Sequence, residues 1–166
     1  MAIDVGVDPG KVAGVTVLLG RRLAWTTTMR GDLLPDILGA VQKLHRLRKQ
    51  QKQTMRVALE LQYGRRGKKG NHKTLEVLMR RRHMWETLLE VYDIPIVKVW
   101  PATWQTQLSE VPRLDGKGNK RSTKVRSLEL ARKVYGESKI SDDAQSDSAL
   151  MARWLSNQTS QDTLVF

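Results

Sequence analysis

Three short segments of the chain place carboxylates where they could bind a metal ion. Asp8 ends an alternating apolar stretch just before a Pro-Gly pair, and Glu60 lies at the end of a second apolar stretch. Asp143 and Asp147 are four residues apart, so on a helix they project from one face about 6 Å apart. Like charges at this spacing destabilise a helix unless a cation lies between them.

Most of these carboxylates also have an ordinary structural explanation. Asp8 could cap the turn that follows it. Glu60 could form an ion pair with a neighbouring Lys or Arg, because a buried carboxylate without a partner is costly. Asp142 and Asp143 would be favourable acids in the first turn of a helix. That explanation does not cover Asp147, which lies one turn further in, beside an apolar run.

The chain offers oxygen atoms as its main metal ligands. It has no cysteine, which excludes a disulfide framework, a Cys-ligated zinc or iron–sulfur site and a thiol nucleophile. Its histidines, His45, His72 and His83, are too scattered for a zinc motif. Carboxylates favour Mg²⁺ or Mn²⁺. Two such ions about 4 Å apart could activate a water and stabilise the leaving oxygen of a phosphodiester.

The positive charge of the chain is concentrated in two glycine-containing segments, 64–82 and 113–126. The 166 residues carry 29 Lys and Arg against 17 Asp and Glu, a formal net charge of +12. Basic glycine-rich loops fit a phosphate backbone, although a basic helix face bound to an acidic partner protein would look similar. The candidate nucleic-acid-binding residues are Arg65, Arg66, Lys68, Lys69, Lys73, Lys117, Lys120, Arg121 and Lys124.

The distribution of apolar residues predicts one α/β domain over residues 1–156 and a polar, flexible tail over 157–166. Three consecutive antiparallel strands are expected at 2–8, 12–19 and 21–28, and parallel strands at 55–61 and 94–100. Helices are expected from Asp32 to Leu47, over 74–92 and 122–135, and from an N-cap at Ser141 to about residue 155. We expect no membrane span, no signal peptide and a cytoplasmic location.

Three of these segments resemble the acidic motifs of RuvC-type Holliday junction resolvases in the RNase H-like superfamily. The opening stretch 3–10 with the strand at 14–17 is similar to the first motif, 58–60 to the second, and 147–152 to the final helix. They occur in the family's order over almost the whole chain. The short chain and the stretch 101–104 look most like the phage-encoded branch, which would place the protein in the cytoplasm of a bacterial host.

The resemblance implies an RNase H-like fold with a mixed five-stranded sheet flanked by helices, and two Mg²⁺ ions held by four acids. Asp8, Glu60 and Asp147 would be three of these ligands. The family's remaining acid, or a His, falls at Ala144, so Asp143 is the substitute and Asp142 the fallback. Lys124 matches the family's lysines near the scissile phosphate. No small-molecule cofactor is implied.

The family is homodimeric and cuts four-way DNA junctions by paired nicks that leave 5′-phosphate and 3′-hydroxyl ends. Met79, Met84, Trp85 and Leu89 could form the interface between two copies, or could belong to the core of one. The segment after Glu60 would lie at the junction centre. There Tyr63 could stack on an unpaired base, or be an aromatic residue at the edge of the core.

Two other functions remain open from the sequence. The same fold could serve a nuclease for RNA–DNA hybrids, transposition or branched replication intermediates. The chain could also be a basic DNA-binding module without catalysis, against which the intact acidic set argues. Cleavage of a panel of junction, nicked, hybrid and plain duplex substrates would separate these possibilities.

Overall fold

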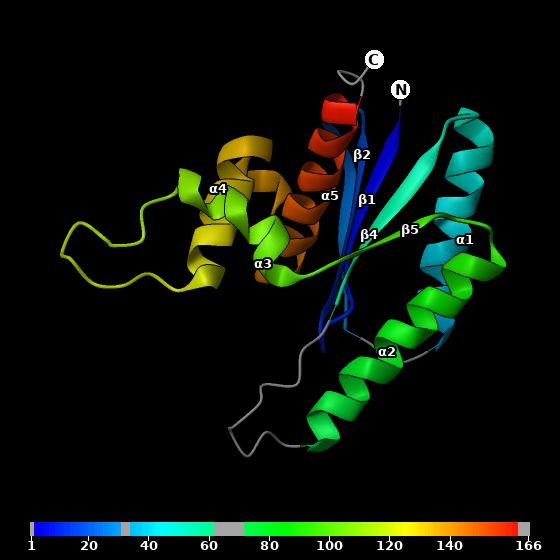
Figure 1. Cartoon of the computed structure of the whole chain (residues 1–166), viewed down its shortest axis with the longest axis horizontal. Coiled ribbons are helices and arrows are strands. Elements are labelled where there is room, and N and C mark those ends of the chain that lie inside the picture. The colour runs from blue at the N-terminus through cyan, green and yellow to red at the C-terminus, as the bar shows by residue number, and fades with distance from the viewer. Residues whose placement is uncertain (1, 31–33, 62–71, 163–166) are drawn as a thin grey trace.

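A mixed five-stranded sheet forms the centre of the chain (Figure 1). The computed structural model describes residues 2–30, 34–61 and 72–162, with the backbone alone for 72–74 and 159–162. The strands are β1 (Ile3–Asp8), β2 (Ala13–Leu19), β3 (Arg22–Met29), β4 (Met55–Glu60) and β5 (Ile96–Val99). Their order is β3-β2-β1-β4-β5; β1–β2 and β2–β3 are antiparallel, and β1–β4 and β4–β5 are parallel. The predicted mixed sheet is confirmed.

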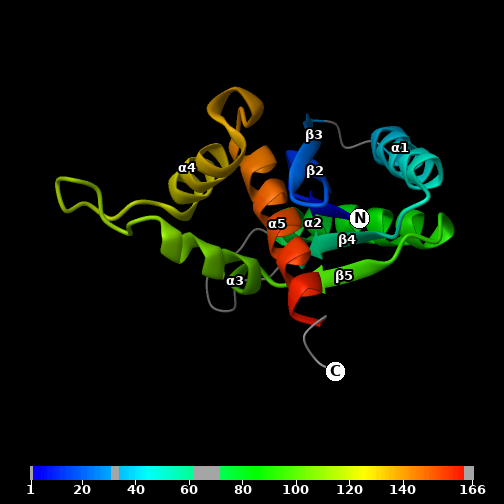
Figure 2. The ribbon, with the colours of Figure 1, turned by 90° about the horizontal axis from the view of Figure 1, so that it is seen from above.

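Helices cover both faces of this sheet. They are α1 (Leu34–Gln51), α2 (His72–Val91), α3 (Pro101–Trp104), α4 (Thr123–Tyr135) and α5 (Asp143–Asp162), with 3₁₀ helices η1 (Gln105–Glu110) and η2 (Glu137–Lys139). Helices α1 and α2 lie on one side, and α5, with α4 outside it, lies on the other (Figures 1 and 2). Within the described ranges, no helix is long and apolar enough to cross a membrane.

The face toward α1 and α2 is the larger apolar core. Side chains alternate along a strand, so Ile3, Val5 and Val7 all point to this side and are fully buried. Trp85 and Leu89 of α2 complete the core and are 1% and 0% exposed. These two residues therefore pack within their own chain, which decides for the core rather than the dimer interface, the two possibilities that the sequence left open.

The opposite face is built for close approach by α5. A Cβ atom on Gly6 of β1 would lie 1.9 Å from the carbonyl oxygen of Ser148, and one on Gly14 of β2 would lie 1.9 Å from that of Ala144. No side chain fits in that space, so glycine lets the helix backbone rest directly on the strands. The hydroxyls of Thr16 and Ser148 share a 2.8 Å hydrogen bond across the same contact.

The last helix differs from its sequence-based bounds at both ends. The backbone N–H of Gln145 donates to Asp142 Oδ1 at 2.9 Å, so Asp142 takes the capping role that we predicted for Ser141. The helix continues to Asp162, well beyond the expected end near residue 155, and residue 156 falls inside it. Its polar final turns carry no apolar periodicity from which a helix could be predicted.

The close contact predicts that glycine is required where α5 meets the sheet. Gly14→Ala should destabilise the protein by about 3 kcal/mol or more, because the methyl group meets backbone that cannot move aside. Gly39→Ala in α1 is the matched control, since a Cβ there meets nothing within 4 Å; it should stabilise the helix by about 0.5–1 kcal/mol. Urea denaturation measures both, and equal stability of Gly14→Ala and wild type would contradict this packing.

Candidate active site

The carboxyl ends of β1 and β4 bring Asp8 and Glu60 to the same edge of the sheet. The parallel register pairs Gly6 with Ala58 and Val7 with Leu59, so Asp8 and Glu60 follow as the next residues on neighbouring strands. Both have the parity of the residues that face α5. Open α/β sheets commonly place their sites at this end of the strands.

The turn after β1 holds Asp8 in place. The backbone N–H of Gly10 donates to Asp8 Oδ1 at 3.0 Å, as expected for an Asp that caps a turn. The turn is itself held from α2, where Arg81 Nη1 donates to the carbonyl oxygen of Gly10 at 2.7 Å. Arg81 is only 6% exposed, and desolvation lowers the pKa of its guanidinium.

Helix α5 supplies the other two acids of this site. Asp143 is its first residue and Asp147 lies one turn later, above the sheet where Gly14 permits close packing. Asp142 has a different role, because its Oδ2 accepts a 2.7 Å hydrogen bond from Thr28 while its Oδ1 caps the helix. Asp142 thus ties α5 to β3, which favours Asp143 over Asp142 as the acid directed at the site.

Burial and repulsion from neighbouring carboxylates make it costly to ionise Asp8 and Asp147. Desolvation raises the pKa of Asp8 to about 6, and Asp143 adds repulsion, while the Gly10 N–H and Lys124 oppose the rise. Desolvation and then the charge of Asp8 raise the pKa of Asp147 to about 7. The Ser127 hydroxyl lies near enough to lower the pKa of Asp147 against this shift. The distance and angle criteria for a hydrogen bond are not satisfied, however, and both Ser127 Oγ and Asp147 Oδ1 are buried without a partner.

Lys124 brings a positive charge to this site. Its Nζ lies 2.5 Å from Asp143 Oδ2, and this hydrogen bond lowers the pKa of Asp143. The same contact raises the pKa of Lys124, to which Asp147 and Asp8 add. The lysine therefore lies within electrostatic reach of three carboxylates that come from β1 and α5.

Glu60 is held by a different neighbour. The indole Nε1–H of Trp104, the last residue of α3, donates to Glu60 Oε2 at 2.8 Å. Trp104 itself is 1% exposed and part of the core beneath α5. An indole N–H that donates to a carboxylate restricts its orientation, as outer-shell partners do for metal ligands.

The side chains as they stand do not assemble the predicted four-acid cluster. In the described part of the chain, no group of three or more Asp, Glu, His or Cys side chains is arranged to hold a metal ion. Asp143 is bound to Lys124 and Glu60 to Trp104. Nevertheless, Asp147 Oδ1 is buried without a partner and Asp8 repels it, so this pair has the donor atoms and the charge that suit a divalent cation.

The basic residues predicted to bind nucleic acid differ in their exposure and contacts. Lys117 and Lys120 are exposed; Arg121 forms an ion pair with Glu129. In the first basic segment, Arg81 faces inward. Tyr63, Arg65, Arg66, Lys68 and Lys69 lie outside the described residues, as does the side chain of Lys73.

Sequence reasoning missed three residues that support the acids. In the sequence, Arg81 is one of several charges in a basic segment, and Ser127 is one polar residue in a predicted helix. Neither position indicates a contact near the acids. Trp104 lies in a quoted stretch, but nothing there indicates a contact 44 residues away. Only the small residues around Asp147 suggested that a helix comes close to the sheet.

Comparison with known proteins supports the fold. No family model matches the chain, and no curated protein matches it. Among solved structures, RuvC of T. thermophilus in complex with Holliday junction substrate is 13% identical, covers 98% of both chains and has a TM-score of 0.65. A second Thermus thermophilus RuvC structure is 14% identical, covers 97% of both chains and has a TM-score of 0.64. The predicted RuvC-type, RNase H-like fold is therefore confirmed.

The pKa of Asp147 predicts that this site destabilises the metal-free protein at high pH. Because its pKa is higher when folded, stability falls as pH rises from about 4 to about 7. Asp147→Asn should therefore raise the Tm at pH 8 by a few degrees, at about 2–4 °C per kcal/mol, and the gain should vanish near pH 4.

Thermal unfolding in chelator at both pH values measures this effect. Asp36→Asn, which removes an exposed first-turn carboxylate of α1, should give no gain that depends on pH in this way. A Tm of Asp147→Asn equal to or below that of wild type at pH 8 would contradict the electrostatics of the site.

Proposed function

We propose that the chain is a divalent-metal-dependent endonuclease that resolves four-way DNA junctions. The single observation that carries the proposal is the pairing of half-buried Asp147 with Asp8, which repels it, beside Lys124 at the edge of a RuvC-like sheet. One of the solved proteins with this fold is bound to a Holliday junction substrate. The excess of basic residues in this chain suits the same class of partner.

Asp8, Glu60, Asp143 and Asp147 would hold two Mg²⁺ ions, for which Mn²⁺ could substitute. The metal supplies positive charge that activates a water and stabilises the leaving oxygen of the phosphodiester. The Gly10 N–H positions one oxygen of Asp8 and the Trp104 indole positions one oxygen of Glu60. Both contacts restrict the orientation of the carboxylates.

Lys124 has a second role in this proposal. In the protein alone its ammonium group neutralises Asp143. Its side chain is 75% exposed, so it can turn to a phosphate of bound DNA and leave Asp143 available as the fourth ligand. Binding of substrate and completion of the acidic set would then be coupled through one side chain.

Paired nicks in opposed strands require two sites, and therefore two copies of the chain. An apolar groove of about 620 Å³ between α1 and α2 provides a surface for this contact. Leu34, Met79, Met84 and Leu88 line it, and Met79 is 40% exposed. We propose a homodimer that uses this groove rather than Trp85 and Leu89, which are core residues.

Cleavage of a synthetic four-way junction tests the nuclease proposal. Wild type with Mg²⁺ should nick opposed strands symmetrically, and DNA ligase should reseal the nicks if they carry 5′-phosphate and 3′-hydroxyl ends. Asp8→Asn and Asp147→Asn should each lose at least about 100-fold in rate, because each removes a ligand charge. Mn²⁺ should support cleavage, and chelator should abolish it.

Asp36→Asn is the matched control and should cut at the wild-type rate. Nicked duplex, RNA–DNA hybrid and plain duplex in the same panel identify a different substrate if one of them is preferred. Junction binding without cleavage in either metal would leave a DNA-binding module in place of the enzyme. A wild-type rate for Asp8→Asn would refute the metal site.

The dimer has its own test by sedimentation. Met79→Glu places a charge in the apolar groove and should shift the protein toward the 18.9 kDa monomer. Val91→Glu is the matched control, since Val91 is 71% exposed at the end of α2 and outside the groove. A dimer unaffected by Met79→Glu would place the interface elsewhere.

A further inference from the structure

Residues 111–122, between η1 and α4, project from the body of the protein in both views (Figures 1 and 2). We name this segment the basic arm. Its two sides run antiparallel, with a bridge between Leu114 and Lys120 and a 2.8 Å hydrogen bond from Arg121 N to the Arg113 carbonyl. Residues 112–120 are all exposed, so its shape does not come from packing against the core.

The tip of the arm is held by one carboxylate. Asp115 Oδ1 accepts from the backbone N–H groups of Lys117 and Asn119, each at 2.8 Å, and Oδ2 accepts from Asn119 Nδ2 at 3.2 Å. Gly118 provides the left-handed conformation that closes the turn, with φ of 80°. Hydrogen bonds from Asn119 lower the pKa of Asp115, so this charge serves the shape of the tip.

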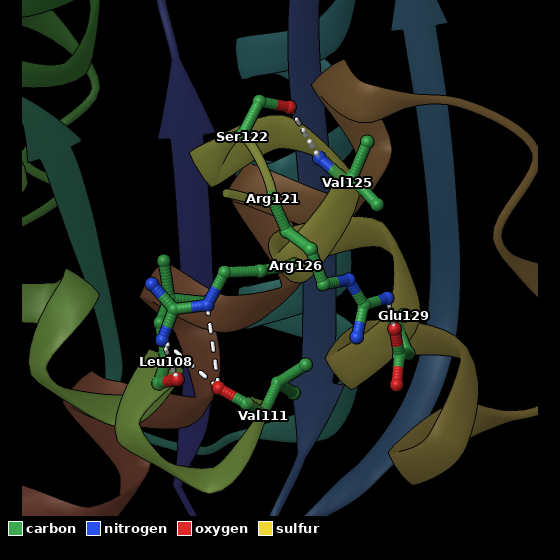
Figure 3. Close-up of polar contacts among 7 residues, drawn as sticks. All are labelled: Leu108, Val111, Arg121, Ser122, Val125, Arg126 and Glu129. Carbon is green, nitrogen blue, oxygen red and sulfur yellow. Dashed lines mark hydrogen bonds and ion pairs between the residues drawn. The ribbon is translucent and has the colours of Figure 1, made fainter. Parts of the chain in front are cut away.

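The base of the arm is clamped to α4 by two arginines (Figure 3). The Arg126 guanidinium donates to the carbonyl oxygens of Leu108 and Val111, where the arm leaves η1. Arg121 forms an ion pair with Glu129 where the arm returns. Arg126 and Arg121 are therefore internal contacts of the arm, although by sequence alone they count as part of its basic surface.

The cations that remain available are directed to solvent. Arg113, Lys117 and Lys120 are exposed and, among the residues that the structure describes, take part in no ion pair. The arm ends at Ser122, whose Oγ caps α4 by accepting from Val125 N at 3.3 Å. Lys124 follows in the first turn of that helix, beside Asp143. A series of positive side chains thus leads from the candidate active site to the tip.

We propose that the basic arm is a preorganised grip on the double-stranded DNA that continues beyond the cleaved phosphate. The proposal rests on the function proposed above. The four residue steps from Arg121 to Lys117 would span about 13 Å if fully extended, so the arm reaches at most about four nucleotides of one strand at 3.4 Å each. Lys117 and Lys120 contact those phosphates, and Arg121 and Arg126 act as positioning residues that keep the arm in register with Lys124.

Phosphate neutralisation tests where the arm binds. Junctions carry uncharged methylphosphonates at two positions within about four nucleotides of the cut. Wild type should bind them about tenfold more weakly than the unmodified junction. Lys117→Ala/Lys120→Ala should bind the unmodified junction about tenfold more weakly and be insensitive to the modification. Its slope of log affinity against log salt should fall by about 1.8, at 0.9 for each lost phosphate contact.

Lys133→Ala/Lys139→Ala removes the same charge from exposed positions at the other end of α4, in its last turn and in η2, and it should retain the wild-type sensitivity to methylphosphonates. If the arm variant were as sensitive as wild type, the arm would not contact these phosphates. This failure is distinct from failure of the proposed function, because wild type would still cut the unmodified junction.

Glu129→Gln tests the clamp, because it frees Arg121 while keeping every cation of the arm. If the ion pair positions the arm, junction affinity should fall about twofold or more even though a negative charge has been removed. Tighter binding would instead make Arg121 a phosphate contact that Glu129 restrains, and would overturn the assignment of Arg121 as a positioning residue. Unchanged affinity would likewise remove the ion pair from the clamp.

Discussion

The direct contact between α5 and the sheet is the constraint on which the rest of the structure depends. Gly6 and Gly14 leave no room for any side chain between strand and helix backbone, and the hydroxyls of Thr16 and Ser148 bond across the contact. Because helix α5 cannot slide or lift without opening a gap, its acids keep one position relative to the end of β1. The candidate site is a consequence of this close packing rather than of a flexible loop.

The same packing concentrates negative charge in a partly buried place. Desolvation raises the pKa of both Asp8 and Asp147, the charge of Asp8 raises that of Asp147 further, and Asp147 Oδ1 lacks a hydrogen-bond partner. A site of this kind is unfavourable for an empty protein and favourable for a bound cation, because the cation removes the repulsion that packing imposes. Lys124 provides part of this positive charge from the exposed edge of the site. Its ammonium group binds Asp143 there and can exchange this carboxylate for another anion.

The lysines of the basic arm, unlike the acids, are presented to solvent. The acids are held by the core, whereas Lys117 and Lys120 stand on an arm that projects into solvent and is stiffened by its own hydrogen bonds. Several arginines that add to the net charge of +12 are used internally: Arg81 supports the Gly10 turn and Arg126 ties the arm to η1. Within the described ranges, the surface available to a polyanion is therefore smaller and more directional than the composition implies.

The sequence by itself determined the strand and helix pattern, the mixed sheet and the acids at two strand ends, because side-chain periodicity and turn residues are local. It also determined that Asp147 needed an explanation, since a second acid inside a helix is locally unfavourable. Only the tertiary structure decided that Asp142 caps α5, that Trp85 is core, and that Trp104 holds Glu60. These are contacts between distant segments or choices among adjacent residues of the same type, and they depend on how closely the helices approach the sheet.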